Sequence, residues 1–185
     1  STEKIDKVGV RTCLMGDVTF KNLKLSSSSI LGNVGGGGMI FTESMKWERT
    51  LLSACHLGAM KRLLERCIEF VNHRKSGNRT ISQHQAISHQ LADMQVKLEA
   101  ARLLTYQAAW GLSQNSRNEI KSSTAKLFVS EFFKEMTLKI IQIFGSTAYR
   151  DNHEAERLLR DAIGSTIYSG TSEIQRNLIA RYMKI

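Results

Sequence analysis

Proline is absent from the 185 residues, which removes the residue that most often interrupts a helix. Cysteine is scarce: the three thiols, Cys13, Cys55 and Cys67, form no CxxC pair and no plausible set of zinc ligands. We therefore expect no metal site. A sparse, odd number of cysteines suits a reducing compartment, with the thiols acting as small core residues.

Long apolar runs are also missing, since no window approaches the ~18 consecutive apolar residues that a membrane-spanning helix needs. The first residues, Ser1 to Lys4, have neither the apolar core nor the cleavage pattern of a signal peptide. We therefore expect no membrane span, and a cytoplasmic protein (or, in a eukaryote, one of the mitochondrial matrix).

Positive charge predominates, with a formal net charge of +9. Clustered basic residues would suggest nucleic acid, but lysine and arginine are spread here among acidic residues. Trp47 and Trp110 fall within apolar periodic patterns, which argues against exposed platforms for base stacking. We expect a solvated surface and no nucleic-acid partner, although the surplus charge suits an anionic ligand such as a phosphate-rich cofactor.

The first forty residues differ in pattern from the rest. Two short β-prone pieces, 8–10 and 18–20, precede the polar run 26–29 and four consecutive glycines at 35–38. The glycines could cradle a phosphate or give a flexible entry into a helix. We prefer the second interpretation, because neither GxGxxG nor GxxxxGK[ST] is present.

From about residue 39 apolar residues recur every three or four positions, which is the period of a helix. Three long stripes result. The first comprises Leu52, Cys55, Ala59, Leu63, Cys67 and Phe70; the second Ile87, Leu91, Met94, Leu98, Thr105, Ala108 and Leu112; the third Ile120, Leu127, Phe128, Phe132, Met136, Ile140 and Ile143.

The helix boundaries follow from polar and glycine residues between the stripes. A loop is predicted at 73–80, and the capping-box patterns Ser82 with Gln85 and Ser116 with Glu119 precede the second and third stripes. A shorter helix is expected over 153–163.

The last helix should begin after Gly170, with Thr171 or Ser172 as its N-cap and Ile174, Leu178 and Tyr182 facing inward. The sequence therefore predicts an all-α, antiparallel up-down helical bundle with a short β-prone N-terminal segment.

One acidic residue breaks the first stripe. Extending that stripe back by four residues from Leu52 places Glu48 on its buried side, where a carboxylate is costly unless it is paired or used. Arg49 points about 100° away and does not face it directly. Alternatively, Glu48 lies in the first turns of its helix, where negative charge is favourable and solvent is close. Periodicity alone favours this second interpretation.

The C-terminal sequence carries a family resemblance. Residues 158–179, LLRDAIGSTIYSGTSEIQRNLI, resemble the C-terminal signature of the acyl-CoA dehydrogenase family. The runs 142–145 (QIFG), 84–87 (HQAI) and 74–76 (RKS) are similar to further family elements in the same order. The resemblance implies that residues 39–185 form the family's C-terminal helical bundle. Residues 1–38 would be a remnant of its β-rich middle domain with a Gly-rich linker.

The resemblance implies the catalytic groups. Many members have the catalytic glutamate at the position of Ser169, whereas a minority branch, the isovaleryl type, has it on the first long helix immediately before an arginine, as in Glu48-Arg49. Glu48 is thus the expected base, and the backbone N–H of Ser169 the expected donor to the thioester carbonyl. Arg49, Tyr168 and Gly170 are expected to contact the substrate.

The resemblance also implies FAD as cofactor. Arg74 and Ser76 match family residues that contact the FAD of a neighbouring subunit, and Gln142 and Gly145 match a second such group. Thr171 and Glu173 match residues near the cofactor at the start of the last helix. In two departures, Gly77 stands where an aromatic residue is common and Ser146 replaces the second glycine of the family's QIFGG run.

The implied function is that of an oxidoreductase of fatty-acid-type metabolism. It would dehydrogenate the α,β bond of an acyl-CoA or an acyl-carrier-protein thioester, with Glu48 taking the α-proton and hydride passing to FAD. An electron-transfer partner and a homodimer or homotetramer are expected, and the isolated chain should be inactive. The alternative is a non-catalytic scaffold subunit that supplies an oligomer interface and cofactor-edge contacts to a flavin-bearing partner.

Overall fold

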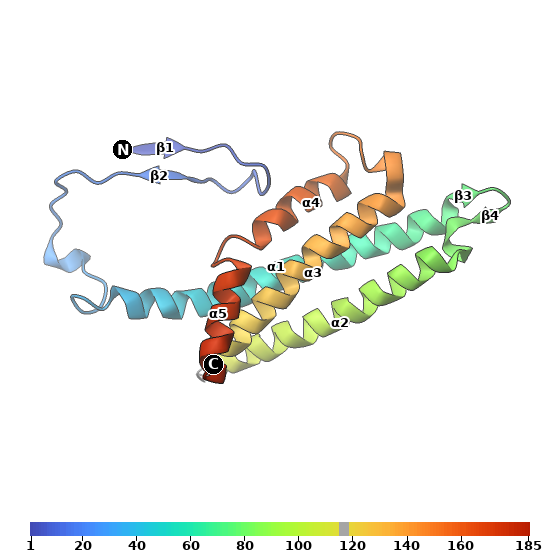
Figure 1. Ribbon diagram of the computed structural model, residues 1–185. Helices are drawn as coiled ribbons and strands as arrows, with labels where there is room; N and C mark the ends of the chain where they lie inside the picture. Colours follow the sequence, from blue (N-terminus) through green and yellow to red (C-terminus); the bar gives the residue numbers. More distant parts are fainter. Residues whose placement is uncertain (115–118) are drawn as a thin grey trace.

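A computed structural model describes residues 1–114 and 119–185. Three long helices, α1 (Gly37–His73), α2 (Gln85–Ser113) and α3 (Glu119–Phe144), run up, down and up (Figure 1). The shorter helix α4 (Glu154–Ser165) returns along α3, and α5 (Ser172–Met183) packs against α3 near the start of that helix. The all-α antiparallel bundle predicted from the periodicity is confirmed.

Helix α3 lies at the centre and contacts each of the other four helices. Its sequence offers apolar or small side chains on most of its circumference, so it can be covered on several sides. The fully buried side chains of the core come from all three long helices. They include Met60, Leu63, Leu64, Cys67, Val71, Met94, Ala101, Val129, Phe133, Met136 and Ile140.

Short elements join the helices. The predicted loop at 73–80 contains a two-stranded hairpin, β3 (Lys75–Ser76) with β4 (Arg79–Thr80), followed by the 3-10 turn η2 (Ile81–Gln83). Ser82 does not cap α2, whose N-cap is His84 without a side-chain bond. The Ser116 capping pattern lies outside the described residues. Gly145, with a φ of +59°, ends α3 and opens the 3-10 turn η3 (Gly145–Thr147).

The N-terminal segment lies off one side of the bundle (Figure 1). Its strands are β1 (Thr2–Lys4) and β2 (Gly16–Val18), an antiparallel pair, and a 3-10 turn η1 (Ser27–Ser29) follows. Of the two β-prone pieces, 8–10 forms no strand, and 18–20 shares only Val18 with β2. The peptide groups at 8–10 bond to α4 instead: the Arg160 guanidinium donates to the Val8 carbonyl at 2.7 Å, and the Val10 N–H donates to Asp161 at 2.5 Å.

Two predicted helix faces need correction. On α1 the buried row runs through Arg49, Thr50 and Ser53, while Glu48 and Cys55 are exposed. On α5, Ile174 and Tyr182 are 45% and 41% exposed, and the buried side chains are Ser172 and Gln175. In both helices the buried side faces polar backbone at one end of the bundle, so apolar periodicity cannot identify it.

Both tryptophans are also more exposed than predicted: Trp47 is 49% exposed and Trp110 is 65% exposed. Among the described residues, none of the helices combines the length and the apolar character needed to cross a bilayer. Within residues 1–114 and 119–185, no group of three or more His, Cys, Asp or Glu side chains could hold a metal ion.

Candidate active site

The turn between α4 and α5 brings the predicted catalytic residues together. The hydroxyl of Ser169 donates a hydrogen bond to the carboxylate of Glu48 on α1. On the next position of α1, Arg49 is 9% exposed and donates through its Nε to the Ser169 carbonyl at 3.0 Å. Adjacent residues on one helix therefore bind the side chain and the backbone of the same serine.

The carbonyl groups of this turn are held from two further helices. The amide Nε2 of Gln175, on α5, donates to the carbonyls of Ser169 at 3.2 Å and Gly170 at 2.9 Å. The ammonium group of Lys126, on α3, donates to the Gly170 carbonyl at 2.7 Å. Gln175 is fully buried and Lys126 is 4% exposed, so both are structural parts of this end of the bundle.

The backbone of the turn is unusual. Ser169 has a φ of +58° and Gly170 a φ of +91°, both in the left-handed region. A Cβ on Gly170 would lie 2.8 Å from the Gln175 amide nitrogen, so glycine is required there. Among the described residues, the N–H groups of Ser169 and Gly170 donate no hydrogen bond within the chain. These donors are free to bind a negatively polarised oxygen.

Tyr168 lies beside this turn and is paired with a residue that the sequence analysis missed. Its hydroxyl forms a hydrogen bond with His56 Nε2 at 2.7 Å, and the His56 ring packs on Phe133 with centroids 5.2 Å apart. Burial, with Lys126 nearby, lowers the pKa of His56 to about 4, and burial raises the pKa of Tyr168 to about 12. Both side chains are therefore neutral at pH 7.

The start of α5 adds two predicted residues at the same end. Thr171 is the N-cap, and its hydroxyl accepts from the Ile174 N–H at 3.4 Å. Glu173 is exposed in the first turn. Hydrogen bonds from its own N–H and from the Thr171 hydroxyl lower the pKa of Glu173. The structure thus gathers Glu48, Arg49, Tyr168, Ser169, Gly170, Thr171 and Glu173 at one end of the bundle.

The remaining predicted residues lie at the opposite end. Arg74 is the C-cap of α1, Ser76 is in strand β3, and Gln142 and Gly145 are at the C-terminal end of α3. All four are exposed. Because a helix rises about 1.5 Å per residue, the continuous α1 separates Glu48 from Arg74 by about 39 Å. The two sets therefore cannot line one small-molecule site within a single chain.

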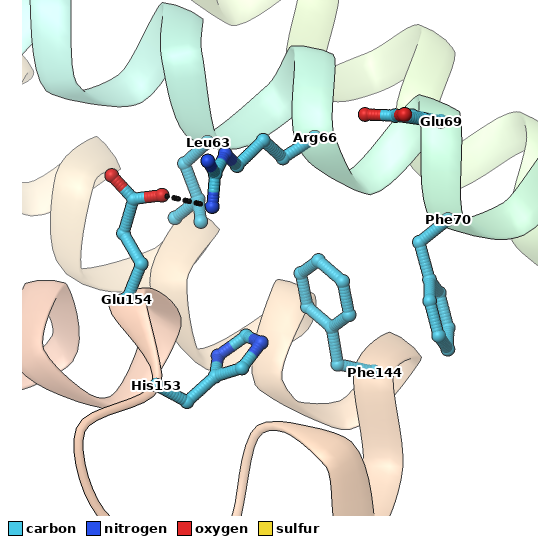
Figure 2. A pocket seen from close by; sticks show the side chains of 7 residues that line it. All are labelled: Leu63, Arg66, Glu69, Phe70, Phe144, His153 and Glu154. Atoms are coloured by element: carbon cyan, nitrogen blue, oxygen red, sulfur yellow. Dashed lines mark ion pairs between the residues drawn. The ribbon is translucent and has the colours of Figure 1, made fainter.

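A hollow of about 220 Å³ lies at this second end, between α1, the end of α3 and the start of α4 (Figure 2). One wall is aromatic: the rings of Phe70 and Phe144 are 4.7 Å apart, and the His153 ring meets Phe144 edge-on at 5.1 Å. The other wall holds an ion pair, Arg66 with Glu154, at 3.1 Å. Aromatic faces beside a guanidinium suit a planar group that carries negative charge.

Comparison with known proteins agrees with the fold and with the signature. The family model described as the acyl-CoA dehydrogenase C-terminal domain matches residues 35–184. An L-prolyl-[peptidyl-carrier protein] dehydrogenase of Pseudomonas fluorescens is 39% identical over 184 residues, which is 100% of this chain and 48% of that protein. The mitochondrial short/branched chain specific acyl-CoA dehydrogenase of Bos taurus is 38% identical, over 95% of this chain and 41% of that protein.

Among solved structures, a prolyl acyl carrier protein oxidase matches with a TM-score of 0.97 and 37% identity, over 100% of this chain and 49% of that one. The chain spans about half the length of the curated relatives it matches. Since the family model covers four-fifths of its residues and the bundle superposes throughout, the chain belongs to the acyl-CoA dehydrogenase family, in which it corresponds to the C-terminal domain.

Proposed function

We propose that this chain is the C-terminal domain of an FAD-dependent acyl-thioester dehydrogenase whose base is Glu48. The observation that supports this most strongly is the contact between Glu48 and Ser169. The family resemblance assigns the base either to the Ser169 position or to the Glu48 position, and these two side chains touch. A carboxylate from α1 therefore reaches the region that a carboxylate from the turn would reach.

The chemistry of the remaining groups fits this role. Removal of the α-proton by Glu48 places negative charge on the thioester oxygen, and the N–H groups of Ser169 and Gly170 are available to bind that charge. Glu48 is exposed in this chain, so bound substrate and the rest of the protein would supply its desolvation. Tyr168, held by His56, would form one wall for the acyl group.

The residues at the second end fit part of FAD. Arg74 is exposed at the end of α1 and forms no ion pair within the described residues, so its guanidinium is available to a pyrophosphate. Gln142 and Gly145 lie within two residues of Phe144 in sequence. The Phe144 ring lines the aromatic hollow, where a planar ring could lie (Figure 2). When bound, FAD supplies the acceptor for the hydride from Cβ.

The separation of the two ends has a consequence for assembly. If Thr171 and Glu173 contact one cofactor and Arg74, Ser76, Gln142 and Gly145 contact another, each chain contributes to two cofactors. Those cofactors would be bound mainly by different copies of the protein. We therefore propose self-association, with residues 1–38 belonging to a β-rich middle domain and residues 39–185 to the bundle.

The substrate we propose is an acyl thioester. The names of two relatives indicate two thioester carriers, a carrier protein and CoA. The Pseudomonas fluorescens protein is named for L-prolyl-[peptidyl-carrier protein], and the Bos taurus protein for acyl-CoA. The two carriers share the thioester, which is the group that Glu48 and Ser169 would meet. An electron-transfer partner would then reoxidise the cofactor.

Flavin retention tests the cofactor assignment. The chain would be incubated with FAD and gel-filtered, alone and joined to the two preceding family domains, and the visible absorbance of the protein peak recorded. We expect flavin in the longer form only, because the chain supplies one wall of a shared site. If the longer form also loses flavin, the dehydrogenase assignment fails and the scaffold-subunit alternative replaces it.

A further inference from the structure

Lys126 is a buried cation whose ammonium group donates to a neutral carbonyl. It lies in the first half of α3 and is 4% exposed, and among the described residues it forms no ion pair with a carboxylate. Burying an ammonium group costs free energy, which a single hydrogen bond to a neutral carbonyl offsets only in part. An apolar side chain of similar length would be less costly at this position, so the packing of the core does not explain the lysine.

Within the described part of the chain, the ammonium group donates its hydrogen bond to the turn before α5. Lys126 and Gln175 together fix the Gly170 carbonyl, while Arg49 and Gln175 fix the Ser169 carbonyl. A trans peptide group is planar, so a held carbonyl directs the N–H of the same peptide group to the opposite side. The donors on α1, α3 and α5 therefore set the direction of the Gly170 and Thr171 N–H groups as well.

The held conformation is one that the chain would not adopt unaided. Ser169, with a φ of +58°, is a non-glycine residue in the left-handed region, and such a conformation persists only where surrounding contacts impose it. In that conformation the Ser169 hydroxyl points to Glu48. Loss of one carbonyl contact would let the turn relax and would move both the hydroxyl and the N–H groups.

We propose that Lys126 is a positioning residue of the dehydrogenation site: its ammonium group, with Arg49 and Gln175, holds the turn at Ser169 and Gly170 in the conformation that faces Glu48 and the thioester oxygen. This inference rests on the proposed function of the site. It adds a residue that touches neither the reacting atoms nor Glu48 and acts on the reaction through the backbone.

The charge environment makes the role pH-dependent. Burial and, next in importance, the guanidinium of Arg49 lower the pKa of Lys126 to about 8, although Glu131 on α3 and Glu173 on α5 act in the opposite direction. His56 on α1, which faces the same region, is neutral above pH 5. Between pH 7 and pH 9, Lys126 is thus the group whose charge at this turn changes.

The experiment compares Lys126→Met and Lys126→Arg in the flavin-loaded longer protein, with Lys139→Met as the matched control. Lys139 lies on the same helix and forms an ion pair with Glu135, and its side chain is 38% exposed. We expect Lys126→Met to lower kcat roughly 10- to 100-fold, which is the loss of rate that a small misplacement of catalytic groups causes. KM should change less, and the thermal unfolding midpoint should not fall. Lys139→Met should leave kcat unchanged.

Two further readouts separate positioning from general stability. In the wild type, kcat should fall as the pH rises above about 8, where Lys126 loses its proton. The Lys126→Arg variant keeps its charge, so it should retain activity and its kcat should not fall in this pH range. Amide hydrogen exchange of residues 166–171 should be faster in Lys126→Met than in the Lys139→Met control.

The outcomes are distinguishable from a failure of the proposed function. If the wild type binds flavin and oxidises thioesters while Lys126→Met keeps its kcat, the inference is wrong and the function stands. If the wild type has no such activity, the proposed function is wrong. Amide hydrogen exchange at residues 166–171 then tests the inference about the turn, and an exchange rate that is unchanged in Lys126→Met overturns that inference.

Discussion

The hydroxyl of Ser169 bonds to the carboxylate of Glu48 across 121 positions of sequence. The contact joins the long first helix to the turn before the last helix. It gives a physical reason why an acid on α1 can stand in for an acid in the turn: the two side chains occupy one region. A base moved between these positions would still face the same atoms of a bound thioester.

Ser169→Ala should weaken the site without abolishing it. The variant removes a hydrogen bond to a charged group, which typically contributes about 1.5–3 kcal/mol, but it leaves the backbone N–H in place. We expect kcat to fall about 10-fold, with flavin binding unchanged, measured by steady-state turnover of the longer protein. A variant as inactive as one without the carboxylate would show that the hydroxyl itself is essential, contrary to this account.

Gly170→Ala should destabilise the fold. A Cβ would meet the Gln175 amide nitrogen at 2.8 Å, and alanine would have to adopt a φ of +91°. We expect the free energy of unfolding to fall by about 1–3 kcal/mol in denaturant titration. The matched control is Gly58→Ala within α1, where a Cβ meets nothing within 4 Å. There alanine should stabilise the helix by roughly 0.5–1 kcal/mol. Equal effects at both positions would contradict the geometry of the turn.

His56 should make the bundle sensitive to mild acid. Its pKa is about 4 in the folded chain and near its ordinary 6.5 when unfolded, so the unfolded state binds more protons between these values. Stability should therefore fall by up to about 3 kcal/mol as the pH drops from 6.5 to 4. The measurement is the free energy of unfolding at several pH values in wild type and in His56→Asn, which should lose this dependence.

A control separates His56 from other groups. His89→Asn alters an exposed histidine of α2 and should keep the acid dependence of the wild type. Paired carboxylates act lower on the pH scale: ion pairing with Lys139 and Lys97 lowers the pKa of Glu135 below its ordinary 4.5, so its stabilising effect is lost only below that pH. An identical pH dependence in His56→Asn and wild type would refute the assignment.

Asp161→Ala should release the N-terminal segment. The carboxylate accepts the Val10 N–H at 2.5 Å, and the segment has few other bonds to the bundle. We expect trypsin to cleave at Lys7 and Arg11 faster than in wild type, while the bundle unfolds at nearly the same temperature. Asp6→Ala, which alters an exposed acid in the same segment, should leave the cleavage rate unchanged.

The sequence predicted the bundle because its core uses the ordinary chemistry of helices. Apolar side chains at a period of 3.6 identified the three long helices, and Gly145 and Thr171 marked helix ends by their backbone and capping preferences. Where the buried side is polar, as at Arg49 and Gln175, the same rule chose the wrong face. Hydrophobic periodicity carries no information about a helix side that binds backbone carbonyls.

The candidate site was predicted in part. Glu48 and Ser169 were named from the resemblance, but nothing in a single sequence shows that they touch. His56 and Lys126 were missed because each looks like one polar residue on a helix. The available signal was weak: Lys126 stands in sequence between the apolar residues Ala125 and Leu127. Only the packing of α1, α3 and α5 around one turn reveals what these residues do.

The most direct test of the central claim is the anaerobic reduction of bound flavin by an acyl thioester in the longer protein, followed by visible absorbance. Glu48→Gln is compared with Glu43→Gln, which alters an exposed acid of the same helix paired with Lys46 at 2.6 Å. We predict that E48Q retains flavin but reduces it roughly 10²- to 10⁴-fold more slowly, the usual contribution of a general base, while E43Q matches wild type. Flavin reduction by E48Q at the wild-type rate would contradict the assignment of Glu48 as the base.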